Sequence, residues 1–261
     1  MEKKANLKID EREIVLEEGA TILDAAEQNG IRISTLCHYS SLSTCIGFRI
    51  CIVEVDGSSR LAASCAMPVR ERMEVVTSND RIIEARRTIF EFLFAKRNHY
   101  CMFCAQSGDC ELKNLAYELK MDHLTVPSSY DEFPVDVKSE YVSIDHSRCV
   151  LCGRCIRACQ EISGSYVLNF QNRSHHALIG VNRNEKREES ICHSCGVFLQ
   201  VCPTKAIYNH YRTHYAAKGR SKDWAVIDSL CPQCGLLCPT LNFVKDNTFI
   251  RPPAVKSKST H

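Results

Sequence analysis

Residues 149–159 read C-V-L-C-G-R-C-I-R-A-C, and residues 192–203 read C-H-S-C-G-V-F-L-Q-V-C-P. In the first run, three cysteines stand two residues apart and a fourth follows after three more, at Cys149, Cys152, Cys155 and Cys159. Three thiols this close in the chain can surround one corner of a small inorganic group, whereas the fourth lies on the helix that follows and points away. Gly153 and Gly196 carry no Cβ, which lets the backbone approach such a group closely.

This spacing is the ligand pattern of bacterial-type ferredoxin modules with two [4Fe–4S] clusters. It predicts one complete cluster, held by Cys149, Cys152, Cys155 and Cys202. The second cluster would take Cys159, Cys192 and Cys195, but Phe198 occupies its fourth position. For this second site, a three-iron cluster, a four-iron cluster with a foreign ligand and no cluster at all stay open.

The composition indicates a protein of a reducing compartment. The chain has 261 residues, enough for two or more small domains, and 17 cysteines that fall in tight groups. A secreted disulfide protein would begin with an apolar leader, which is not seen after Met1, so metal-ligating thiols in the cytoplasm are expected. The 33 basic and 31 acidic residues are nearly balanced, which argues against nucleic-acid binding. No apolar run reaches the roughly 18 residues of a membrane span.

The first 79 residues predict short strands around one helix. Residues 6–17 predict a hairpin, and residues 19–30 predict a helix with Thr21 as its N-cap and Gly30 at its end. Further strands are expected from Cys51 and from Met73. Three segments carry cysteines among these elements: L-C-H-Y-S-S-L (36–42), F-R-I-C-I-V-E-V-D-G (48–57) and S-C-A-M-P-V (64–69).

These segments resemble the [2Fe–2S] domain of the large iron–sulfur subunit of respiratory complex I, which has a β-grasp fold. The same domain opens the diaphorase small subunit of NAD-reducing hydrogenases, iron-only hydrogenases and some formate dehydrogenases. The resemblance implies ligands at Cys37, Cys51 and Cys65, with Phe48 at the remaining family position. Cys45, three residues upstream, takes over that role if the loop re-forms. Otherwise the cluster is lost and Cys45 is an ordinary buried thiol.

Residues 80–97 carry the longest helical pattern, with Ser78 or Asn79 as its N-cap. The next segment, N-H-Y-C-M-F-C-A-Q-S-G-D-C-E-L (98–112), brings together one imidazole and three thiols, those of His99, Cys101, Cys104 and Cys110. By donor type alone this set also suits zinc. It resembles the [4Fe–4S] site with one histidine ligand that follows the β-grasp domain in the complex I relatives, so iron is expected. Residues 111–120 predict a short helix.

Near the end of the sequence, residues 224–230 predict a strand that leads to Cys231, Cys234 and Cys238, and residues 241–247 predict another strand. The motif resembles the opening cluster site of molybdopterin oxidoreductases such as formate dehydrogenase. That family continues with a fourth cysteine and a large catalytic part, which this sequence does not contain. We expect a metal here, either an iron–sulfur cluster or zinc, with an unassigned fourth donor such as His210 or His214.

Together these patterns predict an α+β chain. The expected parts are a β-grasp [2Fe–2S]-type domain (1–79), a small helical [4Fe–4S] domain with one histidine and three cysteine ligands (80–124), a linker (125–140), a bacterial 2[4Fe–4S] ferredoxin-type domain (141–218) and a short C-terminal extension with the cysteine motif (219–261). Within the ferredoxin-type domain, the adjacent His175 and His176 are expected in a strand, with side chains that diverge.

The expected cofactors are a [2Fe–2S] cluster and two to four [4Fe–4S] clusters, with zinc as an option at the C-terminal site. The sequence contains no G-x-G-x-x-G or G-x-x-x-x-G-K-[ST] motif, so flavin and NAD(P) are expected only on partner subunits. The chain by itself is therefore expected to carry clusters for electron transfer but no site for hydride transfer.

The resemblance implies an iron–sulfur electron-transfer subunit of a cytoplasmic NAD(P)-linked oxidoreductase complex. Its partners would be a flavin- and NADH-binding subunit like that of complex I and a further flavoprotein, hydrogenase or formate dehydrogenase subunit, with ferredoxin as another candidate. A flavin-based electron-bifurcating complex of an anaerobe is one such setting. The alternative is a structural scaffold whose sites are partly empty or filled with zinc.

Overall fold

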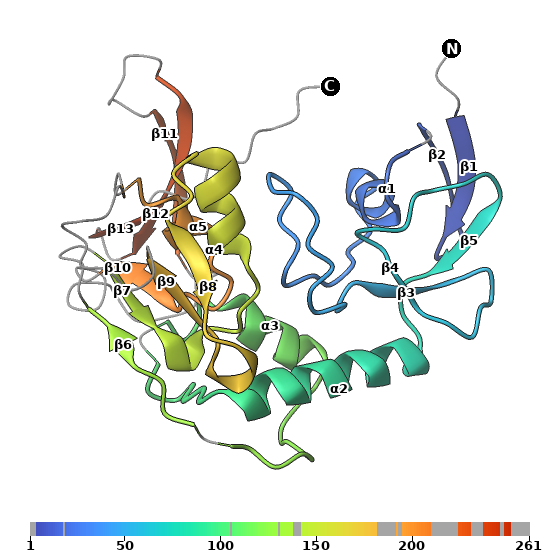
Figure 1. Cartoon of the computed structure of the whole chain (residues 1–261). Helices are drawn as coiled ribbons and strands as arrows, with labels where there is room; N and C mark the ends of the chain where they lie inside the picture. Colours follow the sequence, from blue (N-terminus) through green and yellow to red (C-terminus); the bar gives the residue numbers. More distant parts are fainter. Residues whose placement is uncertain are drawn as a thin grey trace.

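The computed structural model describes residues 4–17, 19–104, 106–129, 131–137, 142–181, 192, 195–209, 224–230, 237–245 and 248–251. These ranges form three cysteine-bearing modules, here called the first (4–79), second (80–129) and third (131–209) modules, and a small C-terminal sheet. The first module lies at one end of the molecule, and a long helix leads from it to the third module (Figure 1). In the described part, no helix is both long and apolar enough to cross a membrane.

The first module is a five-stranded mixed sheet in the order β2-β1-β5-β3-β4. Its strands are β1 Lys4–Ile9, β2 Arg12–Glu17, β3 Ile52–Val55, β4 Ala62–Ala63 and β5 Met73–Val76. β1 pairs antiparallel with β2 and parallel with β5. The predicted hairpin and the strand from Met73 are therefore confirmed, and the strand expected from Cys51 begins one residue later.

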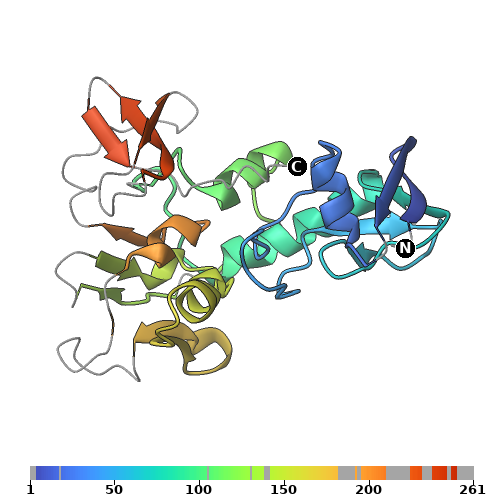
Figure 2. The same cartoon turned by 90° about the horizontal axis from the view of Figure 1, so that it is seen from above.

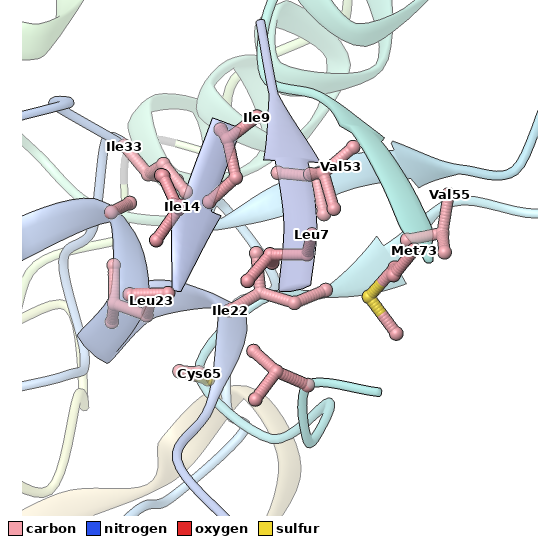
Figure 3. Close-up of a cluster of buried hydrophobic side chains, with 14 of the residues drawn as sticks. Leu7, Ile9, Ile14, Ile22, Leu23, Ile33, Val53, Val55, Cys65 and Met73 are labelled. Carbon is pink, nitrogen blue, oxygen red and sulfur yellow. The ribbon is translucent and has the colours of Figure 1, made fainter. Parts of the chain in front are cut away.

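Helix α1, Ile22–Gln28, packs against this sheet and buries the apolar side chains of both elements. Leu7 and Ile9 alternate with exposed Lys8 along β1, and both belong to one buried cluster with Ile22 and Leu23 of the helix, in which Leu7 lies beside Ile22 (Figure 3). The predicted N-cap is confirmed: the Asp24 amide donates to the Thr21 hydroxyl at 3.2 Å, and the Thr21 amide donates to the Asp24 carboxylate at 2.9 Å.

The second module is built from two helices. Helix α2, Asp80–Lys96, begins at Asn79, whose side chain accepts a 2.9 Å hydrogen bond from the Ile82 amide. Helix α3, Glu111–Glu118, follows the cysteine segment. The view from above shows α2 running between the first module and the third (Figure 2).

One buried apolar cluster joins all three modules. It contains Leu36 and Ile50 from the first module, Phe90 from α2, Leu112, Leu115 and Leu119 from the α3 segment, and Val150 from the third module. We call this set the shared core. Because burial of apolar side chains is the main source of stability, the shared core holds the three modules against one another.

The third module contains a three-stranded sheet in the order β10-β7-β6 and a hairpin of β8 and β9. Its strands are β6 Val135–Asp136, β7 Val142–Asp145, β8 Leu168–Gln171, β9 Leu178–Val181 and β10 Ile207–Asn209. Its helical elements are the 3₁₀ turns η1 His146–Arg148 and η3 Ser174–His176, helix α4 Arg154–Arg157, the π-helical turn η2 Ala158–Ile162, and helix α5 Val197–Val201.

The predicted linker contains one short unpredicted strand, β6, because Val135 and Asp136 pair with β7. One expectation for this region was wrong. His175 and His176 lie in the turn η3 instead of a strand, so their rings do not diverge: the ring centroids are 3.8 Å apart.

The C-terminal sheet consists of β11 Ala225–Leu230, β12 Pro239–Lys245 and β13 Thr248–Arg251. The two strands predicted on either side of the cysteine motif are confirmed as β11 and β12, which pair antiparallel. The sequence did not predict β13. Trp224, just before β11, packs edge-on against Phe243 of β12 with ring centroids 5.9 Å apart.

Candidate metal centres

The first candidate centre gathers the four cysteines of the first module. The Cys51 and Cys65 thiols are 3.4 Å apart. Cys37 and Cys45 both approach Gly47: a Cβ added there would lie 3.6 Å from Cys45 Sγ and 3.8 Å from Cys37 Sγ. Three of the four thiols are buried, and that of Cys45 is exposed at the edge. The loop therefore carries Cys45 back toward Cys37, as a re-formed ligand loop requires.

Phe48 has a different environment. Its side chain packs against the shared core, in which Ile50 and Phe90 are buried. The Phe48 side chain therefore contributes to the contact between modules. Cys45, three residues earlier in the chain, is the residue that lies beside Cys37.

The second candidate centre is a cavity in the second module. Its lining includes His99, Cys101, Cys104 and Cys110, together with Gln106 and Lys113. All four residues predicted for this site are thus brought to one place. Arg148 and Thr204 of the third module complete the wall.

The His99 ring is oriented for metal binding. Its Nε2 atom is buried and has no hydrogen-bond partner among the described residues, whereas the ring makes a hydrogen bond with the backbone of Leu93. A ring that donates Nδ1–H to a backbone carbonyl presents the lone pair of Nε2 to the cavity. Burial lowers the pKa of His99 to about 4, so the imidazole stays neutral and free to donate that lone pair.

The third candidate centre is a cavity lined by Cys149, Cys152, Cys155 and Cys202, the four cysteines predicted for the complete ferredoxin-type site. The connecting loop is in the left-handed region at Leu151, with φ 59°, and at Gly153, with φ 72°. Gly153 is the N-cap of α4, and Gly196, with φ 70°, is the N-cap of α5. Both positions have a positive φ, which glycine adopts without steric cost, and this explains why glycine occurs at each of them.

The donor chemistry of these cavities fits an iron–sulfur group. Burial raises the pKa of the Cys110 thiol to about 12 and that of the Cys149 thiol to about 11. Thiols this buried lose their protons only beside a strong positive charge, which a metal centre supplies. In the described part of the chain, no three His, Cys, Asp or Glu side chains converge on a point that could hold one metal ion; the sulfurs surround cavities instead.

The incomplete second ferredoxin-type site has a less uniform arrangement. Cys159 is buried in the π-helical turn η2, Cys192 is half-buried, and Cys195 is exposed. Phe198 of α5 packs against the same apolar cluster as Cys159 and Cys192. The aromatic ring thus lies where the spacing would place a fourth thiol.

The C-terminal site is described only at Cys238, an exposed residue directly before β12. Cys231 and Cys234, and the suggested donors His210 and His214, lie outside the described residues.

Direct contacts join the three centres. The Arg157 side chain of the third module donates to the carbonyls of Cys37 and Ser43 in the first module, the former at 2.6 Å. The Glu111 amide, next to Cys110, donates to the Pro203 carbonyl, next to Cys202, at 2.8 Å. Thr204 lines both the second and the third cavity.

No sequence pattern singles out Arg157, Thr204 or Gln106. None of the three is a usual ligand of an iron–sulfur group. Their roles depend on contacts with residues that are distant in the sequence and come together only when the chain folds.

Three family models match the chain. Residues 2–80 match a 2Fe-2S iron–sulfur cluster binding domain, residues 86–124 the NADH-ubiquinone oxidoreductase-G iron–sulfur binding region, and residues 139–208 the ferredoxin-like domain of NADH-quinone oxidoreductase subunit 3. The prediction of ferredoxin-like parts that bind [2Fe–2S] and [4Fe–4S] clusters is thereby confirmed at the level of families.

Several curated proteins are similar. The gamma chain of the NAD-reducing hydrogenase HoxS of Cupriavidus necator is 33% identical, over 67% of this chain and 74% of its own length. The HndD subunit of the NADP-reducing hydrogenase of Solidesulfovibrio fructosivorans is 34% identical, over 77% of this chain and 35% of that protein. The NADPH-Fe(3+) oxidoreductase alpha chain of Geobacter sulfurreducens is 28% identical, over 89% of this chain and 27% of that protein. The chain thus spans about a third of the length of the HndD subunit and about a quarter of the length of the Geobacter protein.

A solved structure is similar as well. A chain in the crystal structure of a NAD⁺-reducing [NiFe]-hydrogenase in the H₂-reduced state superposes with a TM-score of 0.72 at 30% identity. The match covers 79% of this chain and 87% of that one.

Proposed function

The chain belongs to the family of iron–sulfur subunits found in NADH-quinone oxidoreductases and NAD-reducing hydrogenases, and we propose that it relays electrons inside a multi-subunit NAD(P)-linked oxidoreductase. The observation that carries this proposal is the contact between neighbouring centres. Thr204 borders two cavities, and Arg157 bonds to the carbonyl of Cys37. Electron transfer through the chain requires redox groups that lie close to one another, whereas a purely structural scaffold has no such requirement.

The proposed ligands follow the geometry. Cys37, Cys45, Cys51 and Cys65 would hold the [2Fe–2S] cluster; His99, Cys101, Cys104 and Cys110 one [4Fe–4S] cluster; and Cys149, Cys152, Cys155 and Cys202 another. The convergence of each set supports these assignments. Cys159, Cys192 and Cys195 are proposed as an incomplete site with three thiols, and Cys231, Cys234 and Cys238 as a further metal site.

The proposed division of the chain is a β-grasp domain over 1–79, a histidine-ligated domain over 80–124, a linker over 125–140, a two-cluster ferredoxin-type domain over 141–218 and a cysteine-motif extension over 219–261. The sheet order of the first module and its covering helix support the β-grasp assignment.

Iron–sulfur clusters supply one-electron transfer. The protein's own residues hold, orient and shield them. The Leu93 backbone fixes the ring of His99, and the shared core packs against Cys110 and Cys152 and keeps water from them. A buried cation lies close to the first centre: the Arg86 guanidinium donates to the carbonyls of Ile50 and Ile52, on either side of Cys51.

The proposed partners are a flavin- and NADH-binding subunit like that of complex I and a second redox subunit of hydrogenase, formate dehydrogenase or flavoprotein type. Ferredoxin is a further candidate, and the proposed location is the cytoplasm. The hydrogenase relatives support the first of these partners most directly. Electron bifurcation stays a prediction that the comparisons do not test.

The test is electron paramagnetic resonance of the complex isolated without oxygen through a tag on this chain, before and after NADH or NADPH is added. Reduction of at least two spectroscopically distinct clusters of this chain is expected. Clusters that are present and reducible by dithionite, but not by either nicotinamide cofactor, would overturn the relay. Zinc in place of iron would favour the scaffold.

A further inference from the structure

Gln106 lines the cavity of the second centre, although glutamine is not one of the residue types expected to ligate the metal there. It stands between Cys104 and Cys110 in the chain, is 1% exposed, and lines the cavity together with His99. Its backbone amide donates to Cys104 Sγ at 3.4 Å. The residue is thus fixed beside one thiol by its backbone, and its side chain is enclosed with the others.

The side-chain amide of Gln106 has no protein partner among the residues that the structure describes. Both its nitrogen and its oxygen are buried and make no hydrogen bond. The neighbouring Lys113 differs, because its Nζ donates to Ser107 Oγ at 2.7 Å. Leaving a buried amide without partners destabilises the fold, and such a group calls for an explanation such as a bound species.

We propose that the Gln106 side chain donates a hydrogen bond to a sulfur of the iron–sulfur group in this cavity and thereby sets its reduction potential. Gln106 is a positioning residue in this role, since it tunes the group without ligating iron. The inference rests on the proposed function, because it needs an iron–sulfur group at His99, Cys101, Cys104 and Cys110.

The direction of the effect follows from charge. One electron enters on reduction, and the group becomes more negative by one unit. A donor to sulfur stabilises the more negative state more strongly, so it raises the potential. The assignment of nitrogen and oxygen in the amide does not affect this argument, because neither atom has another partner among the described residues and the amide can turn.

The decisive variants are Gln106→Met, which keeps the volume and removes both polar atoms, and Gln106→Glu, which keeps the shape and removes the amide donor. Gln28→Met is the matched control, because it makes the same substitution at an exposed position at the end of α1, outside the cavity. Each full-length chain is loaded with iron and sulfide without oxygen and titrated with dithionite, with the signal of the histidine-ligated cluster as the readout.

Both Gln106 variants should lower the ratio of reduced to oxidised cluster at a fixed potential about tenfold, which corresponds to about 59 mV for one electron. Gln28→Met should leave the ratio unchanged. In the metal-free chain, Gln106→Met should raise the midpoint of thermal unfolding, since an unpaired amide is removed.

Full iron content with an unchanged potential in either Gln106 variant would overturn the inference. So would a lower unfolding midpoint of metal-free Gln106→Met, which would mean that the amide has a protein partner. Failure of the proposed function looks different: the unsubstituted chain would then lack iron and sulfide at this site before any potential is compared.

Discussion

Arg157 Nη2 donates a 2.6 Å hydrogen bond to the backbone carbonyl of Cys37, across 120 residues of sequence. Arg157 stands between Cys155 and Cys159, so the bond joins the helical segment of one cysteine site to a candidate ligand of another. The Ser43 amide, which donates to the Glu161 carboxylate at 2.7 Å, reinforces the same contact. The cysteine loop of the first module is therefore docked on the third module.

Replacing Arg157 with Met should loosen this docking. It removes two hydrogen bonds of a charged group to carbonyls, and the expected loss is about 1–3 kcal/mol of unfolding free energy. The [2Fe–2S] signal in electron paramagnetic resonance should also broaden, because the loop of Cys37 gains freedom. Arg173→Met, at an exposed position of the same module, serves as the control. Equal stability and an identical spectrum for both variants would mean that Arg157 has no such role.

Because Cys45 and Cys37 both approach Gly47, we predict that Cys45→Ser abolishes the [2Fe–2S] cluster. Adding Phe48→Cys to that variant should not restore it, because position 48 packs into the shared core. The measurement is the visible circular dichroism of the oxidised cluster together with acid-labile sulfide. Recovery of both in the double variant would show that position 48 reaches the cluster.

His99→Cys should keep iron at the second centre and lower its potential. A thiolate adds a negative charge where the neutral imidazole had none, and added negative charge disfavours reduction. His99→Ala should lower the iron content of this centre, since the cavity then offers only three of its four ligands. A redox titration of both variants distinguishes these outcomes, and normal iron content in His99→Ala would contradict the ligand assignment.

Arg86 is expected to be important for stability. Its buried guanidinium donates to the carbonyls of Ile50, Ile52 and Thr77 at 3.0, 2.8 and 3.2 Å. Arg86→Met removes these three buried hydrogen bonds and should cost about 3 kcal/mol or more. The adjacent Arg87 is exposed, and its guanidinium donates to the Leu119 carbonyl, so Arg87→Met should cost less than about 1 kcal/mol. Thermal unfolding of the two variants tests the difference.

Local patterns were sufficient to predict most elements and most candidate ligands. The cap at Asn79, the hairpin at the start and the strand before the C-terminal cysteines all depend on a few neighbouring residues, so sequence reasoning found them. The cysteine spacing likewise predicted which thiols share a cavity in the second and third modules.

The remaining features depend on contacts between distant segments. The π-helical turn that carries Cys159, the short strand β6 and the packing of Phe48 into the shared core have no counterpart in local periodicity. The same is true of the bond between Arg157 and Cys37, since neither residue's type nor its spacing indicates that the two meet.

The central claim is that this chain carries a relay of iron–sulfur clusters, and the most direct test is iron, acid-labile sulfide and zinc per chain after purification without oxygen. One two-iron and two four-iron clusters predict at least about 10 iron atoms with little zinc, and further filled sites would raise this toward about 18. Substantial zinc with only a few iron atoms would contradict the relay and leave a scaffold.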